Sequence, residues 1–217
     1  MTHPISTVVP TLDGPVLAVL ARTSQPLTGR KIHQLTGSGS ETGTRRVLRR
    51  LARTGLVTAA EVGASVQYTL NRRHLAADAV LELTSMRHRL FHQIRDAIEQ
   101  WSLKPIHASV FGSAARGDGD MESDVDMLFV FEFTHIDTGA DDYLPTGWVE
   151  QIGQLTDQVH AWTGNHLQSY EISQSEFGAH LQAGEPIVDE WVRDAVAIYG
   201  PDIRSLRNRI AGEVMPR

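Results

Sequence analysis

The chain contains no cysteine and no long apolar run. The absence of cysteine excludes disulfides, thiolate zinc sites and a cysteine nucleophile, and it fits a reducing compartment, so we expect a cytoplasmic protein. The apolar run Val16–Ala21 is too short for a signal core or a membrane span, and no basic segment precedes it. We therefore expect neither export nor a membrane partner. With 41% apolar and 21% charged residues, the composition is typical of a folded globular protein.

Acidic residues are scarce at the start of the chain. Residues 1–75 contain ten Lys/Arg and three Asp/Glu, a net charge of +7. Residues 76–217 contain ten Lys/Arg and twenty-three Asp/Glu, a net charge of -13. The two charges sum to the overall net charge of -6. This asymmetry predicts two domains with different partners. A basic part favours a polyanion, whereas an acidic part repels nucleic acid unless metal ions intervene.

The basic part has the pattern of three short helices followed by a hairpin. Helices are expected over 15–21 and 28–35, and Ser38 with Glu41 forms a capping-box pattern for a third. Two strand patterns, 56–60 and 65–70, flank Gly63. On the third helix, apolar residues share one side and arginines the opposite arc. The apolar residues are Val47, Leu48 and Leu51, and the arginines are Arg45, Arg46, Arg49, Arg50 and Arg53.

Across residues 12–73, the segment RRVLRRLARTGLV followed by VQYTLN resembles the winged helix-turn-helix of MarR-like and ArsR-like bacterial regulators. In that family the third helix enters the DNA major groove and the hairpin contacts the backbone, commonly in a dimer. The resemblance implies a homodimer in which four arginines contact phosphates or base edges. They are Arg45, Arg46, Arg49 and Arg50. The alternative is a solvated arginine face on a helix used for packing or dimerisation.

Residues 74–101 have a long helical periodicity, with a stripe of apolar residues from Leu75 to Trp101. We expect a connector helix over 76–103 whose stripe packs on a domain or on a partner subunit. His88 and His92 lie four residues apart and could chelate a metal. No third ligand is evident, so an ordinary surface or packed pair is the favoured interpretation.

The segment VFGSAARGDGDMESDVDMLFVF places acidic residues between two apolar, β-branched runs. Val125–Phe131 has the pattern of a buried strand, so Asp124 and Asp126 should project to one side, about 7 Å apart. Two carboxylates held so close are costly unless they are protonated or bridged by a cation such as Mg²⁺. Gly112 and Ser113 end the preceding strand, where amides and a hydroxyl can bind phosphate oxygens.

The stretch GSAARGDGDMESDVDMLFVF is similar to the minimal branch of the polymerase-beta-type nucleotidyltransferases, and GEPIVDEWVRDAVAIYG extends the resemblance over about residues 104–205. The family has a small mixed α/β domain in which aspartates bind two Mg²⁺ or Mn²⁺ ions. The resemblance implies that Gly112 and Ser113 bind the triphosphate and that Asp124 and Asp126 are catalytic and bind metal. Arg116 either contacts phosphate or braces the loop. Three further acids are expected to be solvated: Asp118, Asp120 and Glu122.

The family needs a third carboxylate on a neighbouring strand, and the candidate strand is Asn165–Ser173. Its pattern places Gln168 where the acid is expected. Glu171 lies three residues further on, on the opposite face of a regular strand. Either a bulge turns Glu171 inward as a third catalytic residue, or the site lacks one ligand.

Aromatic residues in this part of the chain either stack on a base or belong to the core, and the core is the favoured interpretation. They are Tyr143, Trp148, Trp162 and Tyr170. The acidic loop 134–147 is expected to border the substrate pocket.

We therefore expect an α+β protein with a DNA-binding winged helix-turn-helix (1–75), a connector helix (76–103) and a mixed-sheet nucleotidyltransferase-like domain (104–217). The expected reaction transfers a nucleoside monophosphate from a nucleoside triphosphate, ATP being favoured, to a hydroxyl of a protein or small molecule. Minimal family members often modify a partner toxin, so a toxin is one candidate acceptor. Two alternatives remain: a transcriptional regulator whose second domain binds nucleotide without catalysis, and a structural pairing module.

Overall fold

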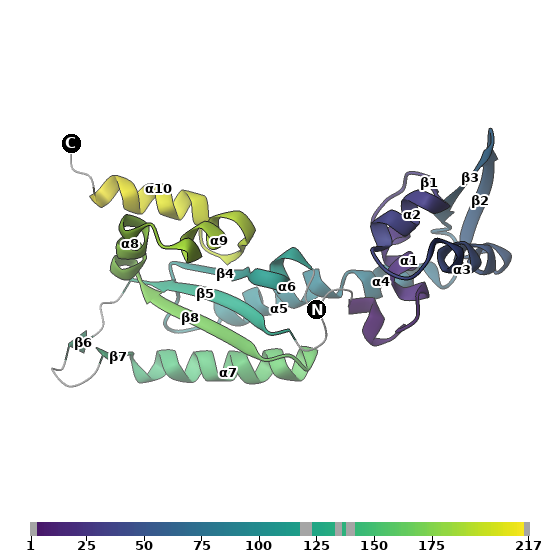
Figure 1. Ribbon diagram of the computed structural model, residues 1–217. Coiled ribbons are helices and arrows are strands. Elements are labelled where there is room, and N and C mark those ends of the chain that lie inside the picture. Colours follow the sequence, from purple (N-terminus) through teal and green to yellow (C-terminus); the bar gives the residue numbers. More distant parts are fainter. Residues whose placement is uncertain (1–3, 118–122, 133–135, 138–141, 215–217) are drawn as a thin grey trace. The chain divides into compact units, whose positions relative to one another are not determined.

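Figure 1 shows a computed structural model that describes residues 4–117, 123–132, 136–137 and 142–214. The chain forms two compact units, residues 3–88 and 89–217, and each is described by itself. In the described parts of both units, no helix is long and apolar enough to cross a membrane.

The N-terminal unit contains four α-helices and a three-stranded antiparallel sheet of order β1-β3-β2 among its described residues. Its elements are η1 (Pro4–Thr7), α1 (Asp13–Ala21), β1 (Leu27–Thr28), α2 (Gly29–Thr36), α3 (Glu41–Arg53), β2 (Val57–Val62), β3 (Ser65–Leu70) and α4 (Ala77–Thr84). The three helices and the hairpin predicted before residue 71 are therefore confirmed. β1, which pairs with β3, was not predicted.

The start of α3 differs from the prediction. Ser40, not Ser38, is the N-cap, and its side chain accepts a hydrogen bond from the Gly43 amide. Glu41 is the first helical residue, and its carboxylate pairs with Arg45 one turn later at 2.5 Å. The capping box predicted with Ser38 is wrong because α3 begins at Glu41, so the residue directly before it, Ser40, occupies the N-cap position.

The single connector helix is also corrected, because two helices occupy this region. α4 ends at Thr84 with Ser85 as its C-cap, and α5 (Met86–Glu99) follows. The Ser85 amide and hydroxyl both bind carbonyls at the end of α4, which terminates that helix. The two apolar faces enter different cores: Val80 belongs to the N-terminal core, whereas α5 buries its face in the C-terminal one. Leu75, predicted to begin one continuous stripe, is 99% exposed.

The C-terminal unit is built on a four-stranded sheet of order β8-β5-β4-β9, in which β5 and β8 are parallel and the other pairs antiparallel. The predicted mixed sheet is therefore confirmed. After α5, the elements are β4 (His107–Phe111), α6 (Gly112–Arg116), β5 (Val125–Phe131), β6 (Ile136–Asp137), β7 (Asp142–Tyr143), α7 (Thr146–Thr163), β8 (Leu167–Ser173), α8 (Gln174–Ala183), α9 (Pro186–Asp194), β9 (Val196–Tyr199) and α10 (Ile203–Val214). β9, which lies between α9 and α10, was not predicted.

Alternate residues of β5 enter two separate cores. Val125, Met127 and Phe129 pack with α5 and α7, whereas Leu128 and Val130 pack with α8, α9 and α10. Figure 1 shows α7 along one face of the sheet and α8 to α10 over the other. This alternation decides which helices face each polar residue of the strand.

Candidate active site

Gly112 and Asp126 approach each other closely where β4 ends. Phe111 is the partner of Asp126 across the antiparallel ladder, so the next residue, Gly112, lies beside the Asp126 side chain. A Cβ built on Gly112 would lie 2.5 Å from Asp126 Oδ2, and the φ of Gly112 is +63°. Both the space and the left-handed backbone therefore require glycine here.

Asp124 and Asp126 are close enough to interact, as expected from their spacing. Asp124 is exposed just before β5, and Asp126 is half-buried within it, on the face shared with Leu128. Burial raises the pKa of Asp126, the charges of Asp124 and Glu190 raise it further, and Arg116 lowers it. An ionised Asp126 is thus unfavourable unless a cation approaches it.

The neighbouring strand places an amide, not a carboxylate, beside Asp126. β8 pairs with β5 in unbroken parallel register over seven residues, and Gln168 is the partner of Asp126. No bulge interrupts this pairing, so nothing turns Glu171 toward the site.

The structure instead places Glu171 on the opposite face. Its Oε2 accepts a hydrogen bond from Trp148 Nε1 at 2.7 Å, and its Oε1 accepts one from Ser169 Oγ at 2.7 Å. Trp148 is fully buried in the core with α5 and α7. Glu171 therefore satisfies a buried indole and is not brought together with Asp124 and Asp126, which corrects its assignment to the catalytic set.

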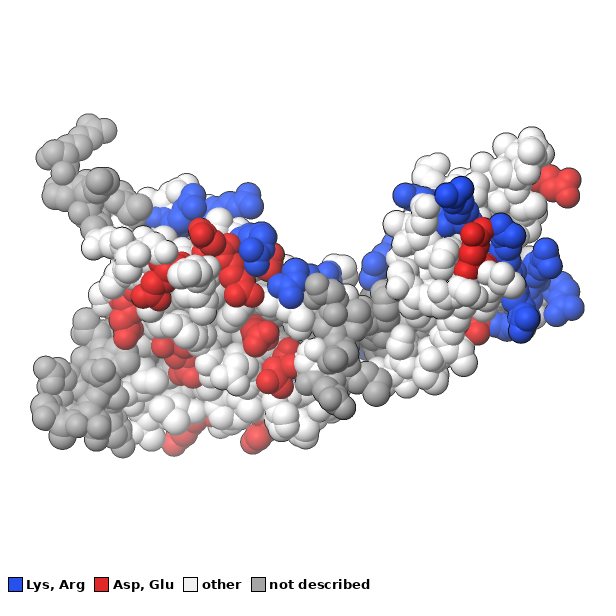
Figure 2. Space-filling view, viewed as in Figure 1, with Lys and Arg blue, Asp and Glu red and all other residues white. Residues whose placement is uncertain are grey.

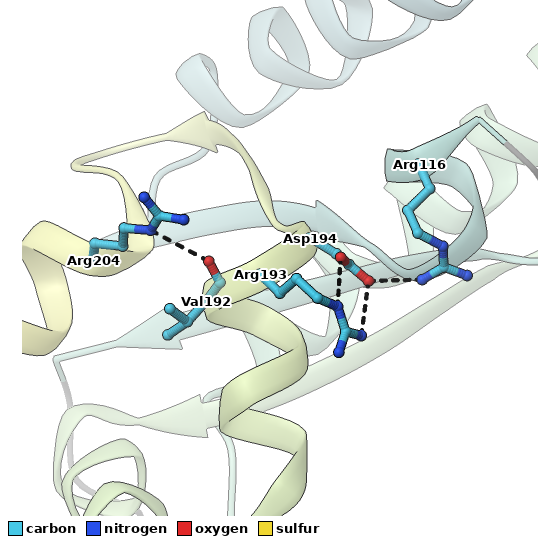
Figure 3. Close-up of polar contacts among 5 residues, drawn as sticks. All are labelled: Arg116, Val192, Arg193, Asp194 and Arg204. Carbon is cyan, nitrogen blue, oxygen red and sulfur yellow. Dashed lines mark hydrogen bonds and ion pairs between the residues drawn. The ribbon is translucent and has the colours of Figure 1, made fainter.

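Arg116 is anchored by a residue that the sequence did not indicate. Its Nη1 donates to Asp194 Oδ2 at 2.7 Å, which ties α6 to the end of α9 (Figure 3). Arg193 binds the same carboxylate. The segment GEPIVDEWVRDAVAIYG has charged residues at helical spacing, but that spacing does not identify a partner 78 residues earlier in the chain.

The donor set of the site fits one hard divalent cation. Asp124 and Asp126 offer carboxylate oxygens, and Mg²⁺ is often held by one or two carboxylates together with substrate phosphates. Within the described ranges, no group of three or more His, Asp or Glu residues is arranged to hold a metal. His88 and His92 are both exposed on α5. Asp118, Asp120 and Glu122 lie outside the described residues.

The aromatic candidates divide between the core and the surface. Trp148 is fully buried against Trp101 and Phe129, and Tyr170 packs near Trp191. Trp162 is 39% exposed. Residues 134–135 and 138–141 of the loop, and the side chain of Tyr143, lie outside what the structure describes.

In the N-terminal unit, α3 buries Val47, Leu48 and Leu51 and exposes its five arginines, as predicted. Figure 2 shows Lys and Arg gathered on this unit. Arg45 pairs with Glu41, and Arg50 pairs with Asp13. Among the described residues, Arg46 and Arg49 have no ion-pair partner.

A groove of about 330 Å³ lies between α3, the start of α2 and the hairpin. Arg30, Arg45 and Arg49 line it together with Tyr68. Positive charge is thus concentrated where a helix and a hairpin meet.

One known family model matches part of the C-terminal unit. The family model of the nucleotidyltransferase domain matches residues 92–179, less than half of the chain. The matched stretch runs from α5 into α8 and contains Gly112, Asp124 and Asp126. No curated protein matches the chain.

Similarities to solved structures are weak. A chain in a crystal structure of a toxin-antitoxin with AMP-PNP is 13% identical, with a TM-score of 0.37 over 57% of this chain and 86% of that chain. Human N-acetylserotonin methyltransferase in complex with SAM is 19% identical, with a TM-score of 0.29 over 43% of this chain and 31% of that chain. Both TM-scores are too low to indicate a shared fold.

Proposed function

We propose that this protein is a metal-dependent nucleotidyltransferase. It transfers a nucleoside monophosphate from a nucleoside triphosphate, ATP being favoured, to a hydroxyl of a protein or small molecule. The match to the nucleotidyltransferase domain over residues 92–179 supports this proposal, because the matched stretch contains the contact between Gly112 and Asp126. A partner toxin and a small molecule are both candidate acceptors.

The proposed roles follow from the geometry of the two carboxylates. Asp124 and Asp126 would hold Mg²⁺ or Mn²⁺, which when bound neutralises charge on the phosphates and favours attack by a hydroxyl. Gly112 leaves room for the Asp126 carboxylate, and the backbone of Gly112 and Ser113 is available to the triphosphate. During transfer, the acceptor oxygen bonds to the α-phosphorus as the bond to pyrophosphate breaks. Arg116 is held beside this site by Asp194.

Transfer of label from ATP labelled at the α-phosphate to components of a cell extract tests this function. The full chain with Mg²⁺ or Mn²⁺ should label a protein or a small molecule. Asp124→Asn and Asp126→Asn should abolish labelling without unfolding the protein, because each removes one of two repelling charges. Asp157→Asn, which changes an exposed carboxylate on α7, is the matched control and should label normally. Labelling that survives in both site variants would contradict the proposal.

We further propose that the N-terminal unit binds DNA as a winged helix-turn-helix, in a homodimer. The exposed arginines of α3 and the arginine-lined groove beside the hairpin support this. Arg46 and Arg49 are the strongest candidates for phosphate contacts, because Arg45 and Arg50 already pair with acids of the chain. A free guanidinium releases more counterions from DNA than one that is already neutralised.

Fluorescence anisotropy with duplex DNA at several salt concentrations tests this second function. Affinity should fall steeply with salt, and Arg49→Ala should reduce the slope by about one. Arg50→Ala, on the same helix, should change the slope less because Arg50 pairs with Asp13. Binding that is absent or independent of salt would leave only a packing role for α3. Sedimentation of the free chain and the complex measures the expected dimer.

Gln168 beside Asp126 favours one alternative, a regulator that binds nucleotide without turnover. A site with two carboxylates can hold one cation, but a second cation then lacks a ligand. Tight triphosphate binding with no transfer to any extract component, together with a nucleotide-dependent change in DNA affinity, would support this alternative over the enzyme.

A further inference from the structure

Asp194, the last residue of α9, binds two arginines at once. Its Oδ2 accepts from Arg116 Nη1 at 2.7 Å and from Arg193 Nη2 at 3.1 Å, and its Oδ1 accepts from Arg193 Nε at 2.9 Å (Figure 3). The Asp194 side chain is only 6% exposed, whereas those of Arg116 and Arg193 are 40% and 66% exposed. A nearly covered carboxylate thus holds two guanidinium groups that remain accessible to solvent.

The cluster brings carboxylate and guanidinium charges together beside the candidate site. Hydrogen bonds from Arg193 and then Arg116 lower the pKa of Asp194, so it is ionised at neutral pH. The ionised Asp194 thus faces two permanent positive charges, and the carboxylate of Glu190 is also near enough to raise the pKa of Arg193. Arg116 is also near enough to lower the pKa of Asp126. The cluster that holds Arg116 therefore borders the pair of carboxylates.

A purely structural clamp between α6 and α9 does not require the second arginine. The contact between Arg116 and Asp194 alone joins the two helices. Arg193 lies next to Asp194 in sequence and ties no further element to the cluster. An exposed ion pair of this kind adds little to the stability of a fold, and it restricts a long side chain. Arg193 uses Nε and Nη2 on Asp194, which leaves Nη1 without a hydrogen bond to any described residue.

We propose that Arg193 is a further phosphate-binding residue of the nucleotide site and that Asp194 is the residue that positions Arg193 and Arg116 toward the β- and γ-phosphates of a nucleoside triphosphate. This inference rests on the proposed nucleotidyltransferase function. The planar guanidinium group binds phosphate oxygens through paired hydrogen bonds. A guanidinium that a carboxylate already holds in place loses less conformational entropy when it binds phosphate. The cluster then selects a triphosphate over a monophosphate, because only the triphosphate extends beyond the metal-binding carboxylates.

Titration calorimetry of the full chain tests this inference, with a non-hydrolysable ATP analogue and with AMP, both in Mg²⁺. Arg193→Gln should raise the Kd of the triphosphate about tenfold, about 1.4 kcal/mol, and leave the Kd of AMP unchanged. The Kd of the triphosphate for Arg193→Lys should lie between those of the unmodified chain and Arg193→Gln, because an ammonium keeps the charge but lacks the paired donors of a guanidinium. Arg204→Gln is the matched control: Arg204 is exposed on α10 and bonds the Val192 carbonyl, not Asp194, so neither Kd should change.

Asp194→Asn separates positioning from folding. This variant should raise the Kd of the triphosphate more than that of AMP. Loss of a purely structural contact would instead lower the melting temperature and raise the Kd of both ligands by the same factor. Equal losses for both ligands, or normal triphosphate binding by Arg193→Gln, would overturn the inference. If the unmodified chain binds no triphosphate, the proposed function itself fails. If it binds triphosphate and Asp126→Asn weakens this while Arg193→Gln does not, only the role of Arg193 is refuted.

Discussion

Replacing Gly112 by alanine tests whether the close approach to Asp126 serves the chemistry. The new Cβ would lie 2.5 Å from Asp126 Oδ2 and 3.4 Å from its Cγ. Real Cβ atoms do not approach an oxygen so closely, so the carboxylate has to turn away. The backbone at φ +63° is also unfavourable for alanine, by about 1–2 kcal/mol.

Gly184→Ala is the matched control. Gly184 has a φ of +65° at the end of α8, and a Cβ there meets nothing within 4 Å. Both variants should therefore lose about 1–2 kcal/mol of unfolding free energy, which lowers the melting temperature by about 2–4 °C for each kcal/mol in a chain of this size. Only Gly112→Ala also displaces a site carboxylate.

Transfer rates of the two variants, measured at a temperature where both are folded, should differ widely. A displacement of about 1 Å at a reacting centre costs on the order of a hundredfold in rate, so Gly112→Ala should lose about that factor. Gly184→Ala should keep the rate of the unmodified protein. If Gly112→Ala transfers as fast as Gly184→Ala, the contact between residue 112 and Asp126 has no catalytic importance, and the reasoning is refuted.

Three further predictions concern stability and the corrected assignments. Ser40→Ala should lower the unfolding free energy by about 1 kcal/mol and Ser38→Ala should not, which chemical denaturation measures; equal losses would contradict Ser40 as the cap. Glu171→Gln should keep transfer, whereas Glu171→Leu removes the acceptor of the hydrogen bond from Trp148 Nε1 and should cost about 1–3 kcal/mol. Loss of transfer in folded Glu171→Gln would restore Glu171 to the site. Burial lowers the pKa of His107, so the unfolded chain binds a proton at this residue more readily than the folded chain does. The free energy of unfolding should therefore fall as pH decreases below about 6.5. His107→Gln should remove that part of the pH dependence, which thermal melts measure.

The His107 prediction depends on its neutral tautomer. Nδ1 lies 2.7 Å from the Pro201 carbonyl, which can only accept, so Nδ1 carries the proton. Nε2 then accepts from Ser109 Oγ at 2.9 Å. A second proton on this fully buried ring would lack an acceptor at Nε2 unless the serine turns, which agrees with the lowered pKa.

Features that depend on neighbouring residues could be predicted from the sequence alone. β5 has the predicted bounds, because its run of apolar residues is buried on both faces of the sheet. The spacing of Asp124 and Asp126 across one strand residue was enough to bring their charges together. The two faces of α3 likewise follow from a repeat of 3.6 residues. In each case the predicted feature depends only on residues that lie a few positions apart in one strand or helix.

Tertiary structure decided the features that join distant parts of the chain. Glu171 meets Trp148 across 23 residues, and Arg116 meets Asp194 across 78. The periodicity over residues 74–101 is continuous in sequence, yet its two halves pack into different cores and the helix ends between them. A local pattern states which side of an element is apolar or charged, but not which element packs against that side. That choice depends on how the strands and helices assemble, because only close packing brings side chains so far apart in sequence within hydrogen-bonding distance.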